Sequence, residues 1–180
     1  PDQVVHRIRH WFSILGNSDG MGIKTLKRLV DAGHTRLPQV YALKEADFLS
    51  MEFGPGQSKV LVKALRDSFE QPVEDARFLA ALGISDLGIG EARRLLSQKS
   101  LEELGEINAD ALKEIKGFGE ITSVRIANGL KTRWPEVKYL LGLGFVLERT
   151  ALTIDRPPIE SPVAGLKIVF TGSMQQGNRN

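Results

Sequence analysis

The sequence feature that most constrains the fold is a short glycine turn that occurs four times. Each copy has the form Gly-apolar-Gly, and each is followed by a segment with the apolar periodicity of an amphipathic helix. The closing glycines lie 34, 34 and 29 residues apart, so the spacing is nearly constant. The pattern predicts helices joined by tight turns. The four copies are Gly20-Met21-Gly22, Gly54-Pro55-Gly56, Gly88-Ile89-Gly90 and Gly117-Phe118-Gly119.

A turn of this form is suited to bind phosphate. Glycine tolerates positive φ and has no side chain, so a phosphate oxygen can approach the backbone N–H groups closely. The following helix adds its unpaired N-terminal N–H groups and the positive end of its dipole. We expect the apolar residue between the glycines to be buried and to hold the turn against its helices. By this pattern the buried residues are Met21, Pro55, Ile89 and Phe118.

The candidate binding residues are the turn residues and the polar side chains in the first turns of the helices behind them. Amide contacts to phosphate carry no sequence information, so the turns predict non-specific binding to the backbone of duplex DNA. The candidates are Gly20, Met21, Gly22, Lys24 and Thr25 in the first copy; Gly54, Gly56, Ser58 and Lys59 in the second; Gly88, Gly90 and Arg93 in the third; and Gly117, Phe118, Gly119, Ser123 and Arg125 in the fourth.

Composition limits the kinds of binding site and partner that the chain can have. The net charge is only +2, so local donors rather than a strong overall field would have to bind nucleic acid. The absence of cysteine excludes disulfides and cysteine-ligated zinc within this chain. No run approaches the roughly 18 apolar residues of a membrane span, so we expect no membrane contact. No catalytic, cofactor-binding or metal-binding residues stand out, and no phosphate-binding loop of the mononucleotide type follows a strand.

We predict an all-α fold in which four helix–hairpin–helix motifs form two pseudo-paired units. The expected helix after the fourth turn is broken at Trp134-Pro135, and residues 145–147 are expected to be extended. We expect a DNA-binding domain over residues 1–150, a Pro-containing linker over 151–164, and the start of a further, strand-containing domain over 165–180. The expected helical segments are 2–15, 23–30, 57–69, 74–82, 91–97, 120–130 and 136–143, with pairs of short turns over 37–49 and 101–115.

The order of these turns resembles one family closely. Residues 7–150 resemble the helix–hairpin–helix domain of bacterial NAD+-dependent DNA ligases, and residues 165–173 are similar to the opening strand of the BRCT domain that follows in that family. In the third copy either Gly88 or Gly90 is the counterpart of the family's single glycine. The matching stretches include Arg7-Ile8-Arg9-His10-Trp11-Phe12, Asp19-Gly20-Met21-Gly22, Gly54-Pro55-Gly56-Gln57-Ser58, Arg77-Phe78-Leu79-Ala80-Ala81-Leu82-Gly83-Ile84, Ser100-Leu101-Glu102-Glu103-Leu104 and Lys116-Gly117-Phe118-Gly119.

The resemblance implies a holding role rather than a joining role. In the family the adenylated lysine, the NAD+ pocket and a four-cysteine zinc module precede this region, and the sequence contains neither cysteine nor Lys-x-Asp-Gly. We therefore expect NAD+, Mg2+ and Zn2+ only in other parts of a parent ligase. The expected partners are nicked double-stranded DNA and the other ligase domains, and the expected location is the bacterial cytoplasm at the nucleoid.

Two other hypotheses remain open from the residues alone. Tandem hairpins also occur in other DNA repair proteins, such as nucleases and junction-binding subunits. A helical scaffold for protein interactions, with purely structural turns, is the third possibility, because helical-pair repeats of about 34 residues also exist. Hairpin N–H groups buried against other helices would favour the scaffold, whereas N–H groups open on the surface would favour DNA binding.

Overall fold

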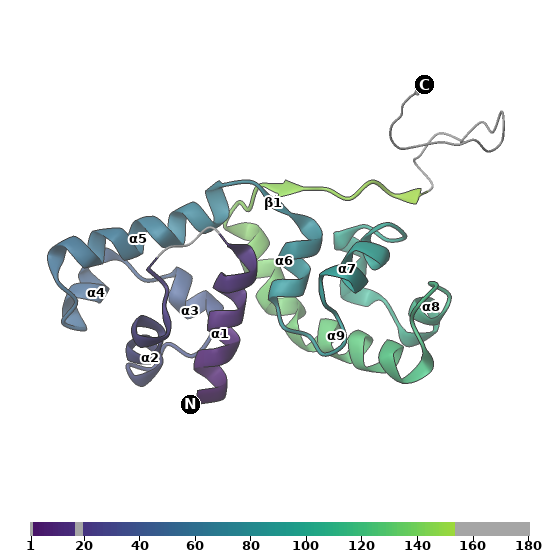
Figure 1. Cartoon of the computed structure of the whole chain (residues 1–180), viewed down its shortest axis with the longest axis horizontal. Coiled ribbons are helices and arrows are strands. Elements are labelled where there is room, and N and C mark those ends of the chain that lie inside the picture. The colour runs from purple at the N-terminus through teal and green to yellow at the C-terminus, as the bar shows by residue number, and fades with distance from the viewer. Residues whose placement is uncertain (1, 17–19, 154–180) are drawn as a thin grey trace, which may run out of the picture.

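The computed structural model describes residues 2–16 and 20–153, and the expected linker from residue 154 and the BRCT-like strand lie outside these ranges. Within them the chain is mostly helical, with one 3-10 helix and a two-stranded parallel sheet (Figure 1). The all-α prediction is therefore confirmed. The elements are α1 Asp2–Leu15, α2 Ile23–Asp31, α3 Leu37–Tyr41, α4 Glu45–Ser50, α5 Pro55–Glu70, β1 Val73–Glu74, α6 Asp75–Ala81, α7 Ile89–Leu96, η1 Leu101–Glu106, α8 Ala109–Lys113, α9 Glu120–Gly142 and β2 Leu147–Glu148.

Eight of these helices form four helix–turn–helix units, as the glycine pattern predicts. The units are α1–α2, α4–α5, α6–α7 and α8–α9, and we call them hairpins 1 to 4. Each second helix begins at a glycine N-cap with extended backbone. Helix α2 shows how such a helix ends. Gly33 has φ +98°, the His34 N–H donates to Leu29 O, and the Gly33 N–H donates to Val30 O, which together form a Schellman motif.

The predicted break at Trp134-Pro135 is wrong, because α9 continues through Pro135. Tertiary packing outweighs the lost backbone hydrogen bond. Val137 and Leu140, on the far side of the proline, are completely buried. Arg133 donates to Leu82 O and forms a short ion pair with Glu136, which ties the helix to the α6–α7 turn.

An aromatic cluster joins the two halves of the molecule. In Figure 1, helices α2 to α5 lie on one side of α1 and α6, and helices α7 and α8 lie on the other. The Phe145 ring lies 5.1 Å from the Phe78 ring, 5.9 Å from Trp11, 6.1 Å from Phe69 and 6.2 Å from Tyr41, between ring centroids. These are favourable aromatic distances, and the contacts bring α1, α5 and α6 onto one residue after α9.

Residues 147–150, after α9, pack against β1, α6 and η1, and we call this segment the strap. Strand β2 pairs in parallel with β1, which the sequence patterns did not predict beyond extended backbone at residues 145–147. Buried Asp75 then accepts hydrogen bonds from the Thr150 N–H at 2.8 Å and the Thr150 hydroxyl at 2.6 Å. Arg149 forms a bidentate pair with Glu102, and its guanidinium holds the pKa of that carboxyl below its usual range.

Tyr41 makes stability depend on alkaline pH. Burial raises the pKa of its hydroxyl from 10.0 to about 12, and the hydroxyl bonds Trp11 and Ser68 in the core. Because the folded state keeps this proton longer, the stabilisation is fully present below pH 10 and is lost as the pH rises toward 12. We expect the free energy of unfolding to fall by about 2–3 kcal/mol across that window. Urea unfolding at a series of pH values measures this. In Tyr41→Phe the free energy of unfolding should not show this fall between pH 10 and 12, and an equal fall in both proteins would contradict the assignment.

Gly105 provides a packing test. A methyl group at this position would overlap the Trp134 ring, so Gly105→Ala should lower the free energy of unfolding by about 1–3 kcal/mol. Gly142 is the matched control, because nothing lies within 4 Å of a methyl group there. Thermal unfolding of both alanine variants checks the prediction, and a loss of stability of equal size in both would refute it.

Candidate nucleic-acid interface

The four turns share one backbone geometry. Each consists of a residue with positive φ, then a buried apolar residue, then the N-cap glycine of the following helix. The positive-φ residues have φ between 67° and 98°, and the apolar residues are at most 5% exposed. The four turns are Gly20-Met21-Gly22, Glu52-Phe53-Gly54, Asp86-Leu87-Gly88 and Gly117-Phe118-Gly119.

The predicted alignment of the second copy is therefore wrong by two residues, and of the two alternatives for the third copy the structure selects Gly88. Gly54 and Gly88 are the N-caps, whereas Gly56 and Gly90 lie inside the first turns of α5 and α7. The physical reason is that Glu52 and Asp86 occupy the left-handed region without being glycine. A glycine count therefore misplaces the turn. It also misplaces the buried residues, since Pro55 is exposed and Ile89 half-buried, while Phe53 and Leu87 fill the apolar position.

The helix starts leave backbone N–H groups open. Each N-cap glycine carbonyl accepts the first helical hydrogen bond from the fourth residue after it, from Leu26, Ser58, Ala92 and Ser123. Within residues 2–16 and 20–153, no acceptor is recorded for the N–H groups between glycine and that residue. All four N-cap glycines are exposed. A methyl group on Gly22, Gly54 or Gly119 would have nothing within 4 Å, so space for a ligand adjoins these N–H groups.

The predicted side-chain donors divide into exposed and buried groups. Lys24 and Lys59 are exposed and extend from the first two turns of α2 and α5. The hydroxyls of Ser58 and Ser123 cannot act as donors at the surface, because both residues are 0% exposed. Their position, four residues after the N-cap, faces inward in each hairpin. Thr25 is also buried.

The arginine predictions need a correction too. Arg93 forms a bidentate pair with Glu74 at 2.7 and 2.9 Å, which lowers the pKa of that carboxyl, and is thus committed to a carboxylate rather than free for phosphate. Arg125 reaches back from α9 to hairpin 3, where it lies 3.3 Å from Asp86. Arg28 and Arg94 also lie against turns, and the glycine pattern did not indicate them because their positions depend on the corrected alignment.

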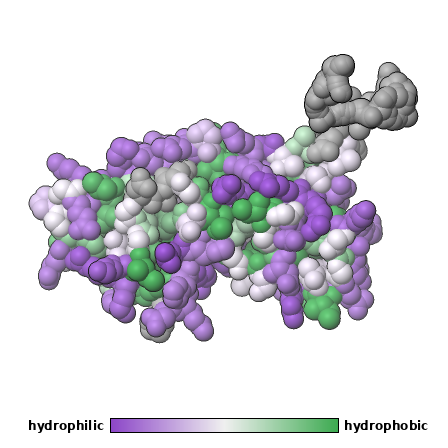
Figure 2. Space-filling view, viewed as in Figure 1, coloured by the Kyte–Doolittle hydropathy of each residue, from purple (hydrophilic) through white to green (hydrophobic). Residues whose placement is uncertain are grey.

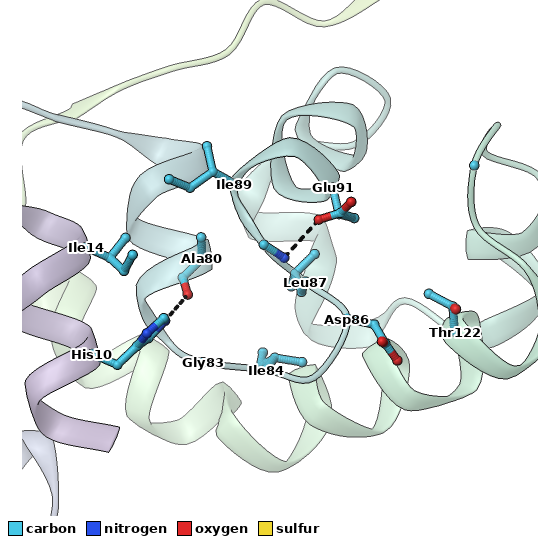
Figure 3. Close-up of a pocket in the computed structure, with 12 residues that line it drawn as sticks. His10, Ile14, Ala80, Gly83, Ile84, Asp86, Leu87, Ile89, Glu91 and Thr122 are labelled. Atoms are coloured by element: carbon cyan, nitrogen blue, oxygen red, sulfur yellow. Dashed lines mark hydrogen bonds between the residues drawn. The ribbon is translucent and has the colours of Figure 1, made fainter. Parts of the chain in front are cut away.

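Hairpins 3 and 4 border a cavity of about 580 Å³ (Figure 3). His10 of α1 closes one side, and its Nε2–H donates a hydrogen bond to Ala80 O at 3.2 Å. The carboxylate of Glu91 accepts from the Gly88 N–H, and Asp86 lies on the same rim. Two carboxylates make this cavity a poor anion site. Hairpin 3 is therefore electrostatically less suited to phosphate than hairpins 1 and 4.

The described residues offer neither a metal site nor a membrane-spanning element. No group of three or more metal-ligating side chains occurs in the described ranges. None of the helices placed there is both long and apolar enough to cross a bilayer. Figure 2 shows apolar residues on this face as patches separated by hydrophilic ones.

Comparisons with known proteins agree with this geometry. Residues 78–132, which span hairpins 3 and 4, match the family described as a SAM-like helix-hairpin-helix tandem. The chain is 51% identical to a protein named DNA ligase from Desulfatibacillum aliphaticivorans over 98% of its own length. It is 40% identical to the DNA ligase of Desulfotalea psychrophila and 37% identical to that of Psychromonas ingrahamii, each over 99% of its length.

The chain thus matches a region of bacterial DNA ligases over nearly its whole length, and this region contains a tandem helix–hairpin–helix. It spans about 28% of the length of the curated relatives that it matches. The resemblance inferred from the order of the turns is confirmed.

Hairpin 4 separates the two roles of glycine. Gly117 has φ +98°, so Gly117→Ser should cost about 1–2 kcal/mol of stability, as left-handed backbone does for a side chain. Gly119 is an extended N-cap with open space around it, where serine is a favoured residue, so Gly119→Ser should change stability by less than about 0.5 kcal/mol. Chemical unfolding of the two variants measures the difference, and the reverse order would refute the assigned turn.

Proposed function

We propose that this chain is the non-catalytic DNA-binding region of an NAD+-dependent DNA ligase that acts in replication and repair. It holds duplex DNA on either side of a nick through contacts to the phosphate backbone. The observation that carries the proposal is the repeated, exposed N-cap turn, present four times with open backbone N–H groups.

The chemistry of the turns sets the kind of binding. Backbone N–H groups and helix dipoles attract phosphate without distinguishing bases, so the grip is independent of sequence. Lys24 and Lys59 add cations beside hairpins 1 and 2. Several turns on one folded chain can contact several phosphates of a backbone, which a single turn cannot do.

The joining reaction belongs to other parts of the proposed ligase. NAD+, Mg2+ and Zn2+ would act there, and the other ligase domains and nicked DNA are the partners of this region. The proposed location is the bacterial cytoplasm, at the nucleoid. In this division of labour the hairpins keep the duplex in place while the catalytic domain seals the nick.

The competing hypotheses have less support. A structural scaffold would have its hairpin N–H groups buried against other helices, whereas the N-cap glycines here are exposed. Another type of repair protein would be expected to have relatives of that type, whereas the relatives above are named DNA ligase.

A salt titration of duplex binding tests the proposal. With roughly four to eight phosphates contacted, log K should fall with log[salt] at a slope of about −4 to −7. Nicked, intact and single-stranded DNA of one length should be compared by fluorescence anisotropy, and both duplexes should bind more tightly than the single strand. Absence of duplex binding even at low salt would refute the proposal.

Blocking the turns tests the mechanism within the same assay. Gly22→Leu and Gly119→Leu place side chains where phosphate would approach, and a Cβ at either position has nothing within 4 Å. Each should weaken duplex binding about tenfold or more, because a charge-assisted hydrogen bond is worth about 1.5–3 kcal/mol. Gly142→Leu, at an equally open glycine on the last turn of α9, is the control. Wild-type affinity in both turn variants would exclude the cradle mechanism.

A further inference from the structure

The corrected alignment shows that the hairpins brace one another in pairs. The sixth residue after each N-cap glycine lies against the turn of another hairpin, and the relation is reciprocal within pairs 1–2 and 3–4. This residue of hairpin 1 lies against the turn of hairpin 2, and that of hairpin 2 lies against the turn of hairpin 1. Hairpins 3 and 4 contact each other in the same way. The four residues at this position are Arg28, Val60, Arg94 and Arg125.

In the first pair an arginine and a valine occupy this position. The Arg28 guanidinium carbon lies 3.7 Å from the centroid of the Phe53 ring, and its Nη2 donates to Met51 O at 2.5 Å. Arg28 is therefore held over the turn of hairpin 2. Val60 is in the reciprocal place, since a methyl group on Gly20 would lie 3.7 Å from its Cγ1.

In the second pair both residues are arginines. A methyl group on Gly117 would lie 3.1 Å from Cζ and from Nη1 of Arg94, whose guanidinium also lies 5.8 Å from the Phe118 ring centroid. Arg94 therefore covers the turn of hairpin 4. Arg125 lies over the turn of hairpin 3, with its Nη1 3.3 Å from Asp86 Oδ2.

These guanidinium groups retain free donors beside an anion-attracting helix start. An arginine carries five N–H donors. Within the described residues Arg28 donates once, to a backbone carbonyl, and Arg94 and Arg125 each donate once, to the carboxylates of Glu91 and Asp86. Unlike Arg93, whose two hydrogen bonds bind both oxygens of Glu74, each of these arginines uses a single donor. The side chains of Arg94 and Arg125 are 50% and 61% exposed. A planar guanidinium pairs with phosphate through two parallel hydrogen bonds. Packing alone does not require arginine here, since Val60 fills the same position and is 54% exposed.

We propose that the phosphate cradles of hairpins 2, 3 and 4 are composite, each with backbone N–H groups from one hairpin and a guanidinium from the paired hairpin. Arg28 serves hairpin 2, Arg94 serves hairpin 4 and Arg125 serves hairpin 3. The turn of hairpin 1 receives no guanidinium from hairpin 2, because Val60 occupies the corresponding position. The proposal rests on duplex DNA binding as the function and assigns the phosphate-contacting side chains within it.

The test combines loss and gain of a guanidinium in the full chain. Each contacted phosphate contributes about −0.9 to the slope of log K against log[salt], so Arg28→Gln and Arg94→Gln should each make the slope less steep by about 0.9. Val60→Arg should make it steeper by about 0.9, because it supplies the arginine that hairpin 1 lacks. Arg28→Lys and Arg94→Lys, which keep the charge, should retain most of the slope.

Two controls are matched to these changes. Arg66 is an exposed arginine further along α5, and Gln71 is exposed at the end of that helix. Arg66→Gln and Gln71→Arg change the net charge equally but lie far from the turns, so both should leave the slope nearly unchanged. Circular dichroism establishes that each variant is folded, and Val60→Arg replaces an exposed side chain, so it does not depend on the core.

The outcomes separate the two proposals. Duplex binding that retains the wild-type slope in Arg28→Gln, Arg94→Gln and Val60→Arg would overturn the composite cradle and leave the DNA-binding function standing. Slope changes of the same size in the two controls would also overturn it, because a general charge effect would then explain the result. Failure of the wild-type chain to bind any duplex would remove the function and the composite cradle together.

Discussion

The structure depends on one left-handed residue, placed two positions before each N-cap glycine. Positive φ at this residue reverses the chain, so that the next side chain is buried while the following helix starts at the surface. Glycine occupies the position in hairpins 1 and 4. At Glu52 and Asp86 a side chain adopts the same conformation, at a cost of about 1–2 kcal/mol, which the burial of Phe53 and Leu87 offsets.

The pairing of hairpins follows from this geometry. Because each turn buries its apolar residue, its outer surface is available to the neighbouring helix of the pair, six residues from that helix's own N-cap. The Phe145 aromatic cluster and the strap through Thr150 then connect the pairs to each other. The open N–H groups of four turns are thereby carried on one framework, which is what simultaneous contact to several phosphates requires.

The sequence predicted most of the helical segments, and it placed the turns and buried apolar residues of hairpins 1 and 4 correctly, because glycine stands where positive φ is needed. It misplaced hairpin 2 by two residues and left the register of hairpin 3 open between Gly88 and Gly90, since no glycine count reveals a left-handed Glu52 or Asp86. Ser58 and Ser123 were predicted to donate hydrogen bonds to phosphate, but tertiary packing buries both residues completely. Local propensity likewise suggested a break at Pro135, where long-range burial keeps α9 continuous.

The most direct test of the central claim is to observe the turn amides themselves. Backbone amide NMR signals should be followed while a nicked duplex is added to 15N-labelled protein. The account predicts the largest shift changes at the open N–H groups of Ile23, Lys24, Glu120 and Ile121, just after the N-cap glycines of hairpins 1 and 4. Shifts concentrated elsewhere, with these amides unchanged at saturation, would contradict it.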